Sequence, residues 1–175
     1  MAVMIKISGA CLVVFAAFYY AKEVNGYTDL RLKQIIAFYN ILLQLKSELM
    51  YMNYTLPECF MNMSDKVDEP FSYWFSNMAE QMNIESTKTF SEIFKDNLDY
   101  LRCHSALNEG DIVIISELKD KFNTADIEVM KKAIDYVLLR LEEQRITLGN
   151  ELKDKKKVVI SLSLFAGITM VILLL

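Results

Sequence analysis

The sequence predicts an all-α protein, an antiparallel bundle of about six helices flanked by an N-terminal and a C-terminal transmembrane helix. Three observations predict this fold class. Apolar stretches without charge lie near both ends of the chain, and apolar residues recur at helical spacing between them. Only two prolines and five glycines occur in 175 residues, so few positions interrupt a helix. We therefore divide the chain into an N-terminal transmembrane segment (1–23), a helical bundle (24–154) and a basic flank with the C-terminal span (155–175).

The C-terminal stretch, residues 158–175, contains no charged residue and directly follows three lysines. Eighteen residues of helix extend about 27 Å, which is close to the roughly 30 Å hydrocarbon core of a bilayer. The alternative is a helix buried in a soluble core, which needs a domain large enough to surround it on all sides. We predict a membrane anchor here.

The N-terminal stretch, residues 7–21, has fifteen uncharged residues between Lys6 and Lys22. Its length also fits the apolar region of a signal peptide. However, Tyr19 and Tyr20 occupy the positions where a signal peptidase requires small side chains. We therefore predict a retained first span, with the two tyrosines at the membrane interface.

The lysines that flank the two spans predict the topology. Lys22, Lys155, Lys156 and Lys157 lie on the side that holds residues 23–154, and we assign them to membrane anchoring at the anionic inner leaflet. The positive-inside rule places the bundle in the cytoplasm. The predicted location is the cell membrane, crossed twice.

The bundle is predicted from helical periodicity and from capping signals. A bend is expected at Asn25-Gly26, and a turn at residues 108–111. Residues 112–115 also suit a buried strand, but no partner strand is evident, so we predict helix. The expected helices are 29–52, a short one from the Thr55/Glu58 capping box to residue 63 or 64, one from residue 68, one from the Thr89/Glu92 capping box, 112–118, and a last one from residue 126 that continues through Gly149 into the membrane.

Helical spacing also predicts part of the core. Phe71, Trp74, Phe75, Met78 and Met82 fall on one stripe of the third helix. Aromatic residues at this spacing are typical of a core and not of a ligand platform, so we assign Trp74 to the core.

The charge balance argues against nucleic-acid binding, because residues 24–154 contain 22 acidic and 14 basic side chains. No glycine-rich phosphate loop is present. His104, the single histidine, adjoins Cys103, but neighbouring helical residues point in different directions, which disfavours a metal site or a catalytic pair. Three scattered cysteines are consistent with a reducing compartment. We expect no catalytic residue, cofactor or metal.

Two segments carry a resemblance to a known family. Residues 45–57, which read LKSELMYMNYTLP, are similar to the segment Leu-x-x-Glu-Ile-x-Tyr-x-x-Thr-Pro-Leu of stage III sporulation protein AB, with the last pair inverted. The pattern from Phe122 through Lys155 to the span containing Gly167 also resembles that family. Where the family reads Leu-Gly-x-Ser-Asp, this chain has FNTAD at 122–126, and Asn123 and Thr124 suit the same turn.

The resemblance implies a non-enzymatic membrane platform of a secretion-like channel complex required for sporulation. Members of the family are similar to the cytoplasmic helical domain of type II secretion F platform proteins. The implied partners are the stage III sporulation ATPase AA and other membrane subunits of the same complex, and a homo-oligomer is left open. Glu48 and Asp126 match family positions and are the predicted docking residues, although each also suits capping or a contact within the bundle.

Two other functions are considered. The first is a two-span membrane sensor or regulator with an extracytoplasmic helical domain, which the flanking lysines disfavour. The second is a membrane-tethered enzyme, for which the sequence supplies almost no chemically suitable residues.

Overall fold

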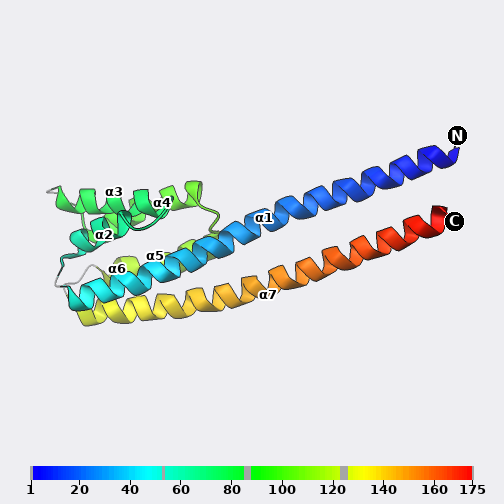
Figure 1. Ribbon diagram of the computed structural model, residues 1–175. Coiled ribbons are helices and arrows are strands. Elements are labelled where there is room, and N and C mark those ends of the chain that lie inside the picture. Colours follow the sequence, from blue (N-terminus) through cyan, green and yellow to red (C-terminus); the bar gives the residue numbers. More distant parts are fainter. Residues whose placement is uncertain (1, 53, 85–87, 123–125, 175) are drawn as a thin grey trace. The chain divides into compact units, whose positions relative to one another are not determined.

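The computed structural model describes the backbone of residues 2–52, 54–84, 88–122 and 126–174. Side chains are described from residue 26 to residue 159 outside the gaps, and at a few positions beyond. Within these ranges every element is helical (Figure 1). The helices are α1 (Ala2–Tyr51), α2 (Leu56–Ser64), α3 (Phe71–Asn83), α4 (Phe90–His104), α5 (Glu109–Ser116), α6 (Leu118–Lys121) and α7 (Ile127–Leu174).

The chain forms two compact units. One unit comprises residues 1–30 and 147–175, and the other, the bundle unit, comprises residues 31–146. Within the bundle unit α2 packs against α3, α3 against α4, and α4 against both α5 and α6. The all-helical prediction for the middle of the chain is confirmed, and residues 112–115 are helical.

The prediction of a bend at Asn25-Gly26 is wrong, because α1 continues through both residues. A Cβ atom added at Gly26 would meet no atom within 4 Å, so no close packing requires glycine at this position. A glycine inside a helix costs about 1 kcal/mol relative to alanine, and a helix of 50 residues tolerates that cost. The predicted continuity of the last helix through Gly149 is confirmed.

Residues 108–111 form a helix start and not the free turn that we expected. Asn108 is the N-cap of α5, and its side chain accepts a hydrogen bond of 2.9 Å from the backbone N–H of Asp111. A helix break then occurs at Glu117, which separates α5 from α6. The residues read as a turn in the sequence because Asn and Gly favour turns and helix caps for the same backbone reasons.

The core of the bundle unit is aromatic, as the stripe on α3 predicts. Trp74 is 1% exposed and its ring lies 5.9 Å from Phe38 of α1, 4.8 Å from Phe75 and 5.3 Å from Phe94 of α4. Phe60 of α2 contacts Phe75 at 5.2 Å. The assignment of Trp74 to the core is confirmed, and aromatic rings join the first four helices.

The described side chains do not include a membrane span: none of their helical stretches is both long enough and apolar enough to cross a bilayer. The side chains of residues 7–21, and most of those of residues 158–175, lie outside the described ones.

Both predicted capping boxes are confirmed. At α4 the Glu92 carboxylate accepts hydrogen bonds from the backbone N–H of Thr89, at 2.8 Å, and from the Thr89 hydroxyl, at 3.0 Å. At α2 Glu58 accepts the equivalent bonds from Thr55 at 2.7 and 2.8 Å. These hydrogen bonds lower the pKa of Glu58 and of Glu92 below the ordinary value of 4.5, and the bond from the backbone N–H has the larger effect.

We expect Thr89→Ala to lower the free energy of unfolding at pH 7 by about 1 kcal/mol, the usual cost of losing a threonine N-cap. Because the pKa of Glu92 is lower in the folded chain than in the unfolded chain, its contribution is complete above pH 4.5. That contribution is lost as the pH falls through the lowered value. Urea unfolding of both proteins at pH 7 and pH 3 tests this. A difference in stability that stays constant between the two pH values would contradict it.

Candidate docking surface

Glu48 lies inside the bundle unit and not on its surface. It is 6% exposed, and its Oε1 accepts hydrogen bonds from Lys66 Nζ at 2.8 Å and from Gln44 Nε2 at 3.4 Å. Its Oε2 is buried and has no hydrogen-bond partner among the described residues. This geometry matches the alternative left open for Glu48, an ion pair within the bundle that ties α1 to the segment after α2.

Asp126 is exposed at the start of α7 and acts there as a cap. Its Oδ1 accepts a hydrogen bond of 2.9 Å from the backbone N–H of Glu128, and its carbonyl oxygen accepts from Val129 and Met130. A carboxylate at a helix N-terminus is also favoured by the helix dipole. The residues before it, 123–125, lie outside the described residues.

The strongest candidate for docking lies where α1 ends and α2 begins. Here Tyr51 is 75% exposed, Met52 58%, Tyr54 45% and Met61 41%, next to the exposed Glu58. We call these five residues the end surface. Exposed aromatic and methionine side chains are enriched at protein interfaces because they bury much apolar area. Tyr51 and Met52 are adjacent in the sequence. The helical spacing of apolar residues does not mark either of them as exposed.

Exposed carboxylates also follow α2 in the sequence. Asp65, Asp68 and Glu69 are exposed after α2, whereas the neighbouring cation, Lys66, already binds Glu48 at 2.8 Å. The end surface itself combines four large side chains with the carboxylate of Glu58. This composition suits a partner that presents apolar and basic groups.

Of the four lysines predicted to anchor the chain in a membrane, three have described side chains. Lys155, Lys156 and Lys157 are exposed in α7, and Lys157 Nζ lies 3.2 Å from Asp154 Oδ1. The side chain of Lys22 lies outside the described ones. Consecutive residues of a helix point about 100° apart, so the three exposed lysines place positive charge on more than one side of α7.

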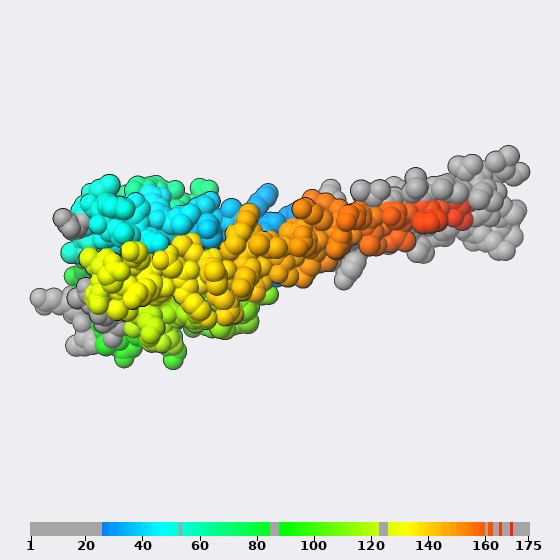
Figure 2. Space-filling model, turned by 90° about the horizontal axis from the view of Figure 1, so that it is seen from below, coloured from blue at the N-terminus to red at the C-terminus, as the bar shows by residue number. Residues whose placement is uncertain are grey.

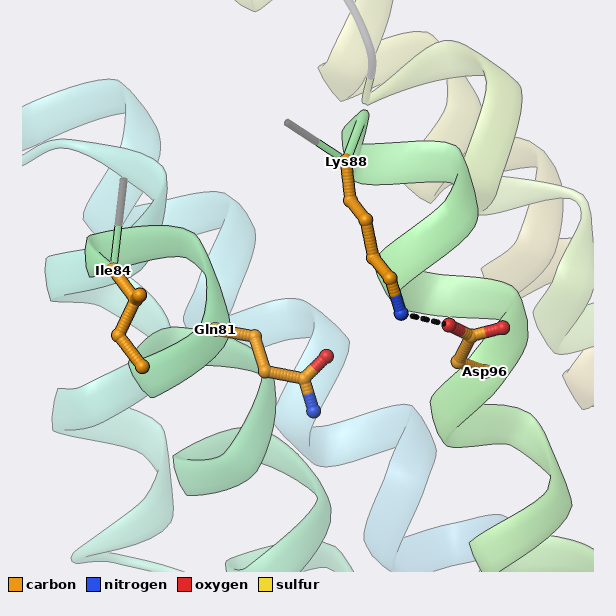
Figure 3. A pocket seen from close by; sticks show the side chains of 4 residues that line it. All are labelled: Gln81, Ile84, Lys88 and Asp96. Atoms are coloured by element: carbon orange, nitrogen blue, oxygen red, sulfur yellow. Dashed lines mark hydrogen bonds and ion pairs between the residues drawn. The ribbon is translucent and has the colours of Figure 1, made fainter. Parts of the chain in front are cut away.

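A hollow of about 340 Å³ lies between the end of α3 and the start of α4 (Figure 3). Its lining residues are Gln81, Ile84, Lys88 and Asp96. The Lys88 ammonium binds the Asp96 carboxylate at 2.6 Å, which raises the pKa of Lys88. Among the described lining residues, the two charged groups bind each other, and Gln81 and Ile84 are neither nucleophiles nor bases. We assign it no chemistry.

His104 and Cys103 do not form a site together. The His104 ring stacks on Tyr100 with ring centroids 4.2 Å apart, and its Nδ1 lies 3.0 Å from the Tyr100 carbonyl oxygen. Cys103 is exposed. Among the described residues no group of three or more His, Cys, Asp or Glu side chains is arranged to hold a metal ion.

The two described cysteines should react very differently with thiol reagents. Cys59 is fully buried, and desolvation, reinforced by Glu48 and Glu58, raises its pKa to about 11. Because the thiolate is the reactive form, Cys59 stays protonated and inert at neutral pH. In a Cys11→Ser background we expect a maleimide to modify only Cys103 in the native protein, and Cys59 only after unfolding. Mass spectrometry of the labelled protein tests this, and rapid native labelling of a Cys103→Ser variant would contradict it.

Comparison with known proteins gives two findings. The family described as stage III sporulation protein AB matches residues 6–175 of the chain. A solved structure of a protein with the same description has a TM-score of 0.64 and 18% sequence identity, and the match covers 71% of this chain and 97% of that chain. At this identity the structure supports the fold alone. No curated protein matches the sequence.

Proposed function

Since the chain belongs to the stage III sporulation protein AB family and so has a role in sporulation, we propose that it is a non-enzymatic assembly subunit anchored in the membrane. Its helical bundle docks the cytoplasmic ATPase of a secretion-like transenvelope complex, the stage III sporulation ATPase AA. The other membrane subunits of that complex are its further partners.

One observation carries the docking proposal, the exposure of the end surface. A monomeric domain of this size buries its large apolar side chains when it can, and the bundle unit does so with Trp74, Phe38 and Phe94. At the end surface Tyr51, by contrast, is three-quarters exposed. Contiguous exposed apolar side chains rimmed by charge are typical of protein–protein contacts.

The charge of the bundle supports a protein partner with basic groups. Residues 24–154 have eight more acidic than basic side chains. This acidic excess raises the rate of encounter with a basic surface and opposes an acidic one. The buried Glu48 takes no part in this contact, because it is bound inside the unit.

A matched pair of substitutions tests the docking surface. Met52, directly after α1, is 58% exposed, and Val113, on α5, is 56% exposed. Met52→Lys removes apolar area and adds a charge that repels a basic partner, so we expect it to weaken capture of the ATPase at least tenfold, about 1.4 kcal/mol. Val113→Lys should leave capture unchanged. Titration of the purified ATPase against immobilised full-length chain gives both affinities. Equal binding by both variants would refute this surface.

The membrane proposal rests on the charge-free ends of the chain and the lysines that flank them. It is tested with Cys103, which is exposed in the bundle unit. In a Cys11→Ser background we expect a membrane-impermeant maleimide to label Cys103 only after the cells are permeabilised. Labelling in intact cells would instead support the sensor with an extracytoplasmic domain. Recovery of the chain in the supernatant without detergent would refute membrane anchoring.

A further inference from the structure

The outward side of α1 in the bundle unit is unusually poor in charge. Buried residues such as Ile35, Phe38 and Leu42 face the core. On the opposite side of α1, every exposed residue between positions 34 and 50 is uncharged. They are Ile36, Ala37, Asn40, Leu43 and Ser47. In a bundle unit with many charged side chains, this face lacks the charges expected of a helix side that contacts only water.

The spacing on this face is that of a second helix seam. Ile36, Asn40, Leu43, Ser47 and the partly exposed Met50 follow one another four, three, four and three residues apart. We call these five residues the outer stripe. Ile36 is 37% exposed and Leu43 44%. Alternating steps of three and four place residues along the contact line of two parallel or antiparallel helices.

Two of the charges that border the outer stripe are paired inside the same copy. Toward α7, which runs beside α1 in Figure 2, Lys46 forms an ion pair with Asp135. Toward α2, Glu48 binds Lys66 at 2.8 Å. Neither pair leaves an uncompensated charge directed at a second helix laid along the stripe.

The exposed face of α7 differs in this respect. Its exposed residues at the same spacing are Lys132, Tyr136, Leu139, Glu143 and Ile146. If two copies met in parallel through α7, Lys132 would face Lys132 and Glu143 would face Glu143. Like charges placed opposite one another oppose association. The five residues of the outer stripe are uncharged, so like charges meet only at Lys33, one turn before Ile36, and not within the stripe.

We propose that the outer stripe binds a second copy of this chain, with the two α1 helices parallel and a two-fold axis between them. In that arrangement each residue of the stripe meets its own counterpart, as a two-fold interface requires. Ile36, Leu43 and Met50 pack against their counterparts, and the two Asn40 amides hydrogen-bond to each other. A single asparagine on such a seam selects the register and the parallel dimer, because other registers leave its amide unpaired against apolar side chains.

The pairing is expected to be weak in dilute solution. One stripe of about five residues buries less than the roughly 1,200 Å² of a small specific interface. Confinement of both copies to one membrane raises their effective concentration and favours the pair. The contact itself follows from α1 alone and does not require the proposed ATPase docking. In a shared membrane, the parallel orientation also lets both copies keep the same topology.

Disulfide cross-linking of the full-length chain tests the arrangement. In a Cys11→Ser, Cys103→Ser background, Asn40→Cys and Leu43→Cys should each yield an interchain disulfide dimer on mild oxidation of the expressed protein. Glu143→Cys, which is exposed on α7, should not. Cross-linking of Glu143→Cys instead would place the interface on α7 and overturn the proposal. If the two variants are mixed and dimers form only between one Asn40→Cys copy and one Leu43→Cys copy, the helices are antiparallel and the proposal is wrong. The absence of any dimer would also overturn it.

A second experiment separates pairing from folding. Leu43→Asp changes a side chain that is already 44% exposed, so the fold should survive. It places two carboxylates opposite each other in the pair, and we expect the dimer fraction, measured by amine cross-linking, to fall at least tenfold. Val113→Asp, 56% exposed on α5, is the matched control and should pair normally. An unchanged dimer fraction in Leu43→Asp, with helix content equal to that of the unmodified chain, would refute the stripe as the interface.

Discussion

Asp111→Ala is expected to destabilise the bundle unit by about 3–5 kcal/mol, the usual cost of breaking a buried ion pair from one side. Asp111 is fully buried, and its carboxylate accepts hydrogen bonds from Arg31 Nε at 2.7 Å and Arg31 Nη2 at 2.9 Å. It also accepts one from the backbone N–H of Asn108 at 3.0 Å, within the α5 capping box. The substitution therefore leaves a partly buried guanidinium without this carboxylate and removes half of a helix cap.

The measurement is urea unfolding of the full-length chain at pH 7, followed by far-ultraviolet circular dichroism. Asp99→Ala is the matched control, because Asp99 is 74% exposed and pairs with Arg102 on the surface of α4. Loss of an exposed ion pair usually changes stability by less than about 1 kcal/mol. Equal effects of the two substitutions would show that the link between α1 and α5 does not hold the bundle unit together.

Trp74→Ala is expected to cost a similar amount, about 3–5 kcal/mol. The Trp74 ring contacts Phe38 of α1, Phe75 of α3 and Phe94 of α4. Truncation opens a cavity between three helices that cannot all move inward. Because these contacts join separate elements, the loss should lower the unfolding midpoint of the whole unit and not only melt α3.

The neighbouring Tyr73 provides the comparison, since it is 48% exposed on the same helix. Tyr73→Ala should cost much less, because it loses chiefly one ring contact, to Tyr100 at 4.5 Å. Trp74→Phe keeps an aromatic ring in place and removes an indole N–H that has no hydrogen-bond partner among the described residues. It should therefore cost less than Trp74→Ala. A loss as large for Phe as for Ala would contradict this, because the retained ring would then contribute nothing to the packing.

Capping boxes correctly predicted helix starts where the stabilising bonds lie within one helical turn. Thr55 with Glu58 and Thr89 with Glu92 satisfy backbone groups within three residues, so their effect does not depend on the rest of the fold. The same local reasoning misread residues 108–111, because a turn and a helix N-cap use the same residue types. It also placed a bend at Gly26, where the preference of one glycine is outweighed by the residues on either side.

The docking residues were harder to predict from the sequence than the helix starts. Glu48 and Asp126 match family positions, but a matched charge in the sequence carries no information on burial. The structure places Glu48 against Lys66, eighteen residues away, and makes Asp126 a cap. The end surface was not singled out, because Tyr51 and Met52 look like ordinary apolar residues at the end of an amphipathic helix.

The helical character of the chain, its capping boxes and the aromatic core stripe of α3 follow from the sequence alone, because each depends on residues near one another along one helix. The family also follows from the sequence, over residues 6–175. Which charges are buried, and which apolar side chains remain exposed, depends on how the helices pack together. Arg31 and Asp111 are 80 residues apart, and their pairing exists only because α1 and α5 pack together. Burial is a property of the elements that surround a residue, and those elements are distant in the sequence.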